Sequence, residues 1–217
     1  MKIIAFGDIH MDYRAAASIP DIRTAHCVIV TGDFTNYGHS NDAEKVLAAI
    51  RGLNPRIYAI PGNLDQNSVL QHLESLGINL HGKGLRIGNL GIFGVGGSNP
   101  TPFNTPTEFS EEELGRIVRE AHASVKDVLV KILVSHTPPF DTATDRIASG
   151  LHVGSREIRR FIEETQPDVC FTGHIHESRG TDRIGRTLIL NPGMLRDPGW
   201  IEFEMREDGT WTASLNG

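Results

Sequence analysis

The chain has 217 residues, and its 21 Lys and Arg residues against 27 Asp and Glu residues give a formal net charge of −6. Hydrophobic residues make up 39% and charged residues 22% of the sequence, which excludes an intrinsically disordered chain and indicates a folded globular protein. The acidic balance, without a basic tract, argues against long nucleic acid as a partner, and no apolar stretch approaches the roughly 18 residues that a membrane-spanning helix needs.

Short apolar segments rich in Ile, Val and Phe alternate along the chain with segments of helical spacing. The predicted strands cover residues 3–6, 28–30, 57–60, 128–134 and 169–171, and the predicted helices cover residues 42–50, 68–76, 111–121 and 155–164. Each strand is short and largely apolar, as expected for a strand buried on both faces. The alternation is typical of an α/β fold, and at roughly 100 to 200 residues per domain we expect one domain over residues 1–217.

A second set of shorter strands is predicted at residues 85–87, 90–95, 187–190, 201–205 and 211–214, and indicates a second, partly antiparallel sheet. Residues 99–109 contain three prolines and predict an ordered surface loop, for which a plain connector is the simpler interpretation and a lid over a site is the alternative. Ser110 and Glu113 predict a capping box, so the acidic residues 111–113 form a first helical turn rather than a metal site.

Metal-ligating side chains follow five of the predicted strands. They are Asp8 and His10, Asp33, Asn63, His136, and His174 and His176. Since sites in α/β sheets form beyond the carboxyl ends of the strands, we expect these side chains to converge at one edge. The spacing of Asp8 with His10, and of His174 with His176, predicts that each pair lies on one side of an extended backbone and can bind one ion.

The composition of this ligand set indicates the class of metal centre. Two carboxylates, four imidazoles and one amide, with no thiolate, suit Mn²⁺, Fe or Zn²⁺ better than Ca²⁺ or a structural zinc site. Seven ligands exceed one tetrahedral site and favour two divalent ions, which at roughly 3.5 to 4 Å apart form the recurring apparatus for in-line attack on phosphorus. We expect Mn²⁺ first, with Fe and Zn²⁺ as alternatives.

The same residues carry a resemblance to a known family. The motifs are Asp8-x-His10, Gly32-Asp33, Gly62-Asn63-x-Asp65, His136 and Gly173-His174-x-His176, in order over residues 8–176. Together they resemble the calcineurin-like metallophosphoesterase superfamily, and Asn191-Pro192-Gly193 is similar to its smaller prokaryotic, phosphodiesterase-type members. The resemblance implies an α/β fold built as a four-layer αββα sandwich, with two mixed β-sheets flanked by helices and a dinuclear centre at the sheet edge.

Carried over by position, the resemblance assigns one metal ion to Asp8, His10 and His176. It assigns the second ion to Asn63, His136 and His174, with Asp33 bridging both. It implies a metal-dependent phosphoric ester hydrolase in which a metal-bound hydroxide attacks phosphorus, while the ions and Asn63 bind the phosphoryl oxygens. Asp33 and Asn63 are therefore expected to be catalytic residues.

Leu64 departs from the family pattern. Many members have His at this position, where it assists phosphate binding and protonates the leaving group, whereas Leu cannot donate a proton. A positioned general acid contributes about 10² to 10⁴ in rate, so we expect a phosphodiesterase acting on a small phosphodiester or nucleotide-type substrate with a stable leaving group. The alternatives are a phosphomonoesterase and a catalytically weak, metal-binding protein-interaction scaffold of the same fold.

Further residues are candidates for roles around this centre. His152 lies in a glycine-bounded loop between two ligand motifs and is the candidate catalytic proton donor, with a surface or capping histidine as the alternative. Asp65 is interpreted as a cap of the following helix, and the alternatives are organisation of the Asn63 turn or a hydrogen bond to a ligating imidazole. Asn36 and Asn191 are candidates to support the ligand loops.

The N-terminus and the cysteines bear on where the protein works. The N-terminus runs directly into a short apolar segment without the apolar core of a signal peptide, so we expect a cytoplasmic location. Cys27 and Cys170 lie in apolar, strand-like segments, which favours small buried side chains over a disulfide. The sequence leaves a homo-oligomer open, since it does not show which apolar groups are exposed.

Overall fold

Two central strands show why the sequence contains short, almost wholly apolar segments. The computed structural model describes residues 1–217, and in it β1 (Lys2–Phe6) and β2 (Cys27–Val30) are buried along nearly their whole length. Ile4 packs into one core and its neighbour Ala5 into another, because successive side chains of a strand point to opposite faces. Both faces of these strands are therefore covered, as their composition predicts.

The first sheet has five strands in the order β11-β10-β1-β2-β3. Besides β1 and β2 it contains β3 (Ile57–Ala59), β10 (Trp200–Met205) and β11 (Trp211–Asn216). β1, β2 and β3 are parallel, whereas β10 pairs antiparallel with β1, and β11 pairs antiparallel with β10. The sheet is therefore mixed.

The second sheet has six strands in the order β4-β5-β6-β7-β9-β8. These are β4 (Gly84–Ile87), β5 (Leu90–Val95), β6 (Val130–Ser135), β7 (Val169–Phe171), β8 (Gly180–Ile184) and β9 (Thr187–Asn191). The four inner strands run parallel, and the two edge strands, β4 and β8, are antiparallel to their neighbours. This sheet is therefore mixed as well.

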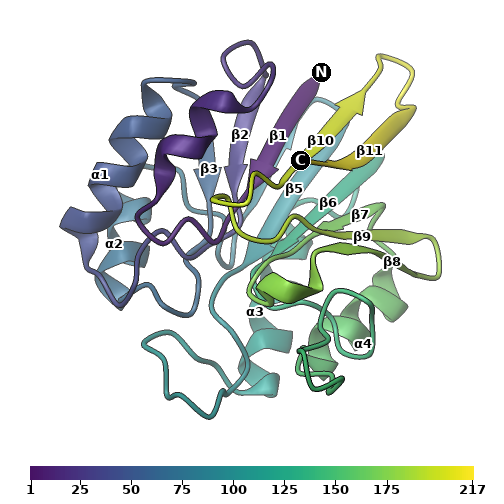
Figure 1. The fold of residues 1–217 in the computed structure, drawn as a ribbon. Coiled ribbons are helices and arrows are strands. Elements are labelled where there is room, and N and C mark those ends of the chain that lie inside the picture. The colour runs from purple at the N-terminus through teal and green to yellow at the C-terminus, as the bar shows by residue number, and fades with distance from the viewer.

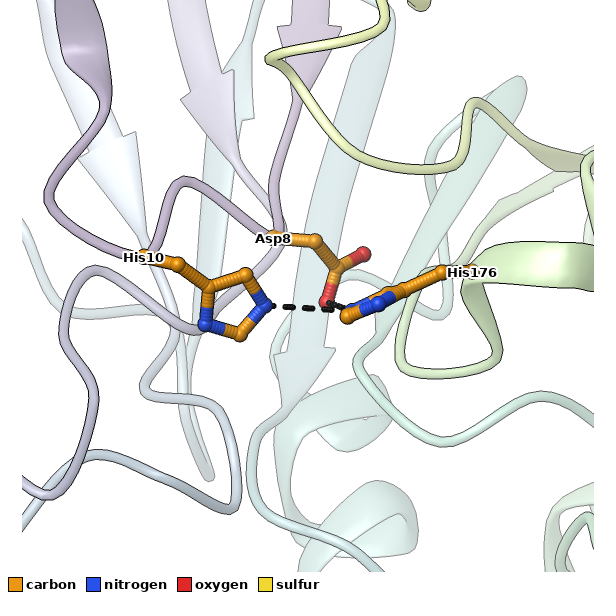
Figure 2. A group of neighbouring side chains, drawn as sticks. All are labelled: Asp8, His10 and His176. Atoms are coloured by element: carbon orange, nitrogen blue, oxygen red, sulfur yellow. Dashed lines mark hydrogen bonds and ion pairs between the residues drawn. The ribbon is translucent and has the colours of Figure 1, made fainter.

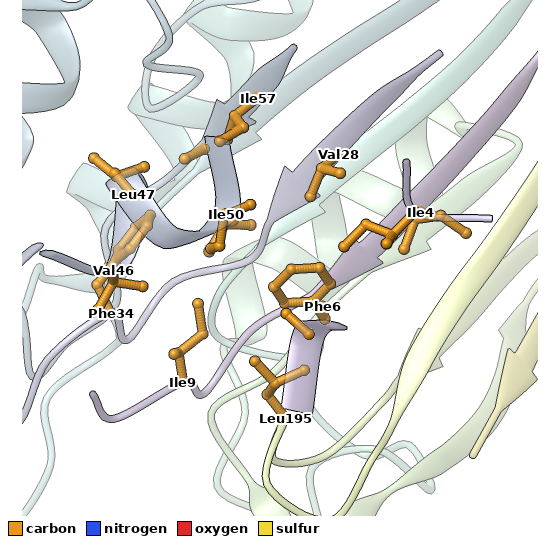
Figure 3. Packing of buried hydrophobic residues seen from close by; sticks show 14 of the residues in the cluster. Ile4, Phe6, Ile9, Val28, Phe34, Val46, Leu47, Ile50, Ile57 and Leu195 are labelled. Carbon is orange, nitrogen blue, oxygen red and sulfur yellow. The ribbon is translucent and has the colours of Figure 1, made fainter. Parts of the chain in front are cut away.

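The two sheets pack face to face and are flanked by helices (Figure 1). Helices α1 (Ser40–Arg51) and α2 (Asn67–Ser75) cover the outer face of the first sheet. Figure 3 shows apolar side chains packed between these helices and the sheet, including Phe6 from the sheet and Leu47 from α1. Helices α3 (Glu111–Ala123) and α4 (Arg156–Thr165) cover the second sheet in the same way. The structure confirms the predicted four-layer αββα sandwich.

Serine side chains cap the N-termini of α3 and α4. The Ser110 side chain accepts a hydrogen bond from the Glu113 backbone N–H, and the Glu113 carboxylate accepts one from the Ser110 backbone N–H, which confirms the capping box at the start of α3. Ser155 caps α4 by accepting from the Ile158 backbone N–H at 3.2 Å, so this helix begins one residue later than predicted. None of the helices is long and apolar enough to cross a membrane.

The structure confirms a second, partly antiparallel sheet that contains the predicted strands β4, β5 and β9, but the predicted sheet is wrong for four other strands. The composition of β6 and β7 predicts that they lie with β1, β2 and β3, but they pair with β5 and β9 in the second sheet. The sequence predicts β10 and β11 in the second sheet, but they extend the first sheet from β1. The composition of a short strand shows whether the strand is buried on both faces, because buried strands are apolar. It does not show which strand lies beside it.

Candidate metal centre

The candidate ligands come from strands of both sheets rather than from one. The carboxyl ends of β1, β2 and β3 lie at the same end of the sandwich as those of β6 and β7 (Figure 1). At this end the fully buried His136, after β6, approaches the first sheet, and its Nδ1 lies 2.8 Å from the Thr31 carbonyl oxygen after β2. The His174 backbone N–H, after β7, likewise donates to the Asp8 carboxylate after β1. The ligand loops therefore join the two sheets.

The first group of close ligand atoms consists of Asp8, His10 and His176, and Figure 2 shows both rings turned toward the Asp8 carboxylate. The two Nε2 atoms lie 3.1 Å apart, and His176 Nε2 lies 3.3 Å from Asp8 Oδ1. His10 Nδ1 is buried without a hydrogen-bond partner, so the polar side-chain contacts of this ring run through Nε2. Two imidazole nitrogens facing each other beside a carboxylate fit a divalent metal ion.

The second group consists of Asp8, Asp33 and His136, so Asp8 is common to both groups. The Thr31 carbonyl accepts from His136 Nδ1–H and directs Nε2 toward Asn63 Oδ1 at 3.0 Å and Asp33 Oδ2 at 3.5 Å. Asp33 Oδ2 also lies 4.0 Å from His10 Nε2. Asp33 therefore faces histidines of both groups, as a bridging carboxylate would.

His174 lies beside these groups but outside the sets of mutually close ligand atoms. Its ring centre is 5.2 Å from that of His136. Burial and the neighbouring His136 lower the pKa of His174 to about 4, which keeps the ring neutral and its lone pair available to a metal. Six of the seven predicted ligands thus make direct contacts with one another through their side chains, and His174 packs against them.

Asp33 and the facing His136 shift each other's pKa. Burial opposes ionisation of Asp33, but the facing His136 and His10 rings outweigh it and lower the Asp33 pKa. Burial in turn works against a charged His136, but the Asp33 carboxylate outweighs it and raises the pKa of His136 to about 9. A metal ion that binds His136 must displace this proton, because imidazole binds metals through an unprotonated nitrogen.

The backbone of the ligand pairs differs from the predicted extended form. Asp8, His10, Asp33 and His174 have φ values of 48°, 48°, 51° and 68°, in the left-handed region that non-glycine residues rarely adopt. His176 begins a short 3-10 helix. The predicted extended geometry of the two pairs is therefore wrong. The chain turns sharply after each strand, and these turns gather the side chains over the strand ends.

Asp65 joins two of the ligand loops. Its buried carboxylate accepts from the backbone N–H groups of Gly62 at 2.9 Å, Thr35 at 3.0 Å and Phe34 at 3.2 Å, and from the Thr35 hydroxyl at 2.9 Å. The N-cap of α2 is Gln66, so the favoured capping interpretation of Asp65 is wrong. Burial and the nearby Asp33 charge raise the pKa of Asp65 to about 7. The residue organises the Asn63 turn, which is the first of the two alternative interpretations; its hydrogen bonds do not reach an imidazole.

Two asparagines hold other ligand loops. The Asn191 side-chain amide donates to the Ile175 carbonyl at 2.9 Å and accepts from the Gly193 backbone N–H at 2.9 Å. The Asn36 amide donates to the His10 carbonyl at 3.3 Å. Each contact fixes the backbone beside a candidate ligand, which is the supporting role predicted for them.

His152 is tied to its own loop rather than to the seven ligands. Its Nδ1 lies 2.6 Å from Asp145 Oδ1, and its Nε2 lies 3.7 Å from Asp141 Oδ1. The loop itself runs beside a ligand loop, because the Ala148 backbone N–H donates to the Glu177 carboxylate next to His176. The proton-donor role of His152 stays a prediction.

Thr105 contacts the candidate centre without any signal in its sequence spacing. The Asn63 side-chain amide donates to the Thr105 hydroxyl oxygen at 3.0 Å. Thr105 lies in the proline-containing loop 99–109, so this loop does more than connect two elements.

The other histidines belong to neither group of close ligand atoms, and four of them make structural contacts. These contacts are His39 with Ser68, His72 with Glu44, His81 with the Gly96 N–H, and His122 with Phe93 and Phe161.

Comparison with known proteins identifies the family. The family model of the calcineurin-like phosphoesterases matches residues 1–178. The Methanocaldococcus jannaschii protein MJ1162 is 36% identical over 197 residues, which cover 88% of each chain. The structure of TT1561 from Thermus thermophilus has a TM-score of 0.72 at 17% identity, covering 98% of this chain and 97% of that one. A dimetal phosphatase from Danio rerio has a TM-score of 0.70 at 11% identity, covering 100% and 96%.

These two structures share the fold, and the match of the family model spans all seven candidate ligands. The five motifs of residues 8–176 therefore lie within the matched residues, whereas Asn191-Pro192-Gly193 lies beyond them. The chain belongs to the calcineurin-like phosphoesterase family.

Proposed function

We propose that the protein is a dinuclear metal-dependent phosphodiesterase that hydrolyses a small phosphodiester or nucleotide-type substrate. The observation that carries the proposal is the pair of ligand groups, Asp8 with His10 and His176, and Asp8 with Asp33 and His136. A shared residue makes the two groups adjacent, and adjacent ions are what a two-metal attack on one phosphoryl group requires.

In this proposal Asp8, His10 and His176 hold one ion, and Asn63, His136 and His174 hold the other, with Asp33 between them. Bound divalent ions supply Lewis-acid activation of water and neutralise charge on the phosphoryl oxygens. The protein orients the ligands: the Leu64 backbone N–H holds Asp33 Oδ1 at 2.9 Å, and Thr31 holds His136. Nitrogen and oxygen donors without thiolate suit Mn²⁺ first, and also Fe or Zn²⁺.

The preference for a diester rests on Leu64. Its backbone N–H donates to Asp33, but its side chain has no proton to give to a leaving group. A substrate whose leaving group is already stable as an anion depends least on such a proton. Activated diesters should therefore react more readily than alkyl monoesters.

The test compares hydrolysis of bis-p-nitrophenyl phosphate and p-nitrophenyl phosphate by metal-stripped protein before and after Mn²⁺ addition. We expect Mn²⁺-dependent turnover with the diester preferred, and loss of that turnover in Asp33→Asn, because the variant replaces a carboxylate that faces both ligand groups. Equal or faster turnover of the monoester would contradict the diester preference. Two bound ions without turnover of either ester would favour the protein-interaction scaffold.

The absence of a proton donor at Leu64 concerns that position alone, and we further propose that His152, from another loop, supplies a proton to leaving groups that need one. The fully buried Asp145 accepts from the Thr142, Gly154 and Asp141 backbone N–H groups, at 2.9, 3.0 and 3.1 Å, and from His152 Nδ1–H at 2.6 Å. An Nδ1–H committed to Asp145 leaves Nε2 as the nitrogen that can exchange a proton with a substrate. The side chain is 28% exposed, so this nitrogen can be reached.

Replacement of His152 by Ala is expected to lower kcat about 10²-fold for diesters with poor leaving groups, and far less for p-nitrophenyl esters. The measurement is the dependence of log kcat on leaving-group pKa across a series of aryl and alkyl esters, which should become steeper in the variant. His72→Ala is the matched control, since His72 pairs with Glu44 between α1 and α2. Parallel dependences for His152→Ala and the wild type would remove His152 from the mechanism.

A further inference from the structure

We infer that Thr105 and Glu108 are positioning residues that fix the orientation of the Asn63 amide and thereby set the affinity of one of the two metal ions. The inference rests on the metal centre of the proposed function. Both residues lie in loop 99–109, outside the motifs of the family resemblance. The contacts that carry the inference run from Glu108 through Thr105 to Asn63.

The first step is that the Thr105 hydroxyl donates its proton in a hydrogen bond to Glu108. Glu108 Oε1 accepts from the Thr105 hydroxyl at 2.6 Å, the Thr105 backbone N–H at 2.7 Å and the Thr101 hydroxyl at 2.6 Å. Burial opposes ionisation of Glu108, but these hydrogen bonds outweigh it and lower its pKa. An ionised carboxylate only accepts hydrogen bonds, so the Thr105 hydroxyl must donate to it.

The second step concerns the two ends of the Asn63 amide. With its proton committed to Glu108, the Thr105 oxygen can only accept, and Asn63 Nδ2–H donates to it at 3.0 Å. Asn63 Oδ1 then points the other way, to 3.0 Å from His136 Nε2. A rotated amide would present its NH₂ group to His136 instead, and an amide NH₂ has no lone pair to offer a metal. The contact with Thr105 therefore selects the metal-binding orientation.

The third step is the burial of this contact. Asn63 is 3% exposed and Thr105 is 8% exposed, so solvent competes little with the hydrogen bond between them. The Thr107 backbone N–H donates to the Asn63 carbonyl at 3.1 Å and holds the loop against the Asn63 turn. The backbone contact positions the turn, whereas the Thr105 hydroxyl is the contact that holds the NH₂ end of the amide away from His136.

The effect should be confined to one ion. The Asn63 side chain contacts His136, whereas Asp8, His10 and His176 form the other group without Asn63. Loss of a hydrogen bond that orients a metal ligand typically weakens metal affinity 10- to 100-fold. Thr105→Val keeps the shape of the side chain but removes both the donor and the acceptor.

The experiment is a calorimetric Mn²⁺ titration of the metal-stripped full chain, with bound metal counted after equilibrium dialysis. We expect Thr105→Val to weaken one of two binding events about 10- to 100-fold and to leave the other unchanged. Thr105→Ser, which keeps the hydroxyl, should restore the weakened event. The Tm of each metal-free variant reports any general loss of structure.

Three results would overturn the inference: unchanged binding of both ions in Thr105→Val, equal weakening of both ions, or Thr105→Ser behaving as Thr105→Val. Because the readout is metal binding, it is independent of turnover. A wild-type protein that binds two ions but hydrolyses no ester would refute the proposed hydrolase function, while the difference between the Val and Ser variants would still decide the role of Thr105.

Discussion

Replacement of Asp65 by Ala is expected to destabilise the protein by about 3 to 5 kcal/mol. The carboxylate is fully buried and accepts four hydrogen bonds, three of them from the backbone N–H groups of Phe34, Thr35 and Gly62. Without it these donors stay buried and unpaired, and each unsatisfied donor costs about 1 to 3 kcal/mol before local rearrangement. The loops that carry Asp33 and Asn63 would then lose the contact that joins them.

The measurement is the free energy of unfolding from urea denaturation of the metal-free protein, together with Mn²⁺ affinity. Asp65→Asn keeps one acceptor oxygen and should lose less stability than Asp65→Ala. Asp127→Ala is the surface control, since the Asp127 side chain is 71% exposed and lies 4.0 Å from its nearest cationic partner, Arg86. A change below about 1 kcal/mol in Asp65→Ala, within the range of ordinary point mutations, would contradict the proposed role of Asp65.

Replacement of Gly62 by Ala is expected to lower diester turnover more than about 10²-fold, the effect of a displacement of about 1 Å at a reacting centre. A Cβ on Gly62 would lie 2.0 Å from Asp33 Oδ1 and 2.2 Å from the Asp33 backbone nitrogen. Such distances are far below van der Waals contact, so the Asp33 and Asn63 loops must separate. Overpacking of this kind also destabilises a protein by about 1 to 3 kcal/mol.

Gly52→Ala is the matched control for this variant. Gly52 has an ordinary φ of −64°, and the nearest atom to its added Cβ is the Ala49 carbonyl oxygen at 3.3 Å. Steady-state turnover of bis-p-nitrophenyl phosphate and thermal denaturation are measured for both variants. Wild-type turnover in Gly62→Ala would show that the close approach of the two loops is not required.

The positions of the candidate ligands could be predicted because they follow from a local rule. Asp33 comes within a few residues of β2 and His136 directly after β6, and the apolar composition of each strand marks where the strand ends. Sites of α/β proteins form beyond such ends, whichever strands pair. The glycine before Asn63 is also readable in the sequence, although only the structure shows that its missing Cβ makes room for Asp33.

The supporting contacts could not be predicted in the same way. Asp65 lies two residues before the start of α2, so its sequence position favours a helix cap, yet its carboxylate accepts hydrogen bonds from the Asp33 loop some 30 residues earlier. Thr105 is an ordinary residue of a proline-containing loop, and it meets Asn63 across a separation of 42 residues. Contacts between residues so far apart in the sequence depend on how the layers pack, and they cannot be predicted from side-chain type alone.

The sequence by itself determined the four α-helices, every strand except β8, the ligand types and their places at the strand ends. It could do so because hydrophobic periodicity, capping residues and turn residues act over a few neighbouring positions. Only the tertiary structure decided which sheet each strand joins, how left-handed turns aim Asp8 and His10, and which residues hold the ligand loops together. His136 illustrates the difference: it follows a strand of the second sheet, but its Nδ1–H donates to Thr31 of the first, 105 residues away. Burial of both sheets against each other creates that contact, and no local propensity encodes it.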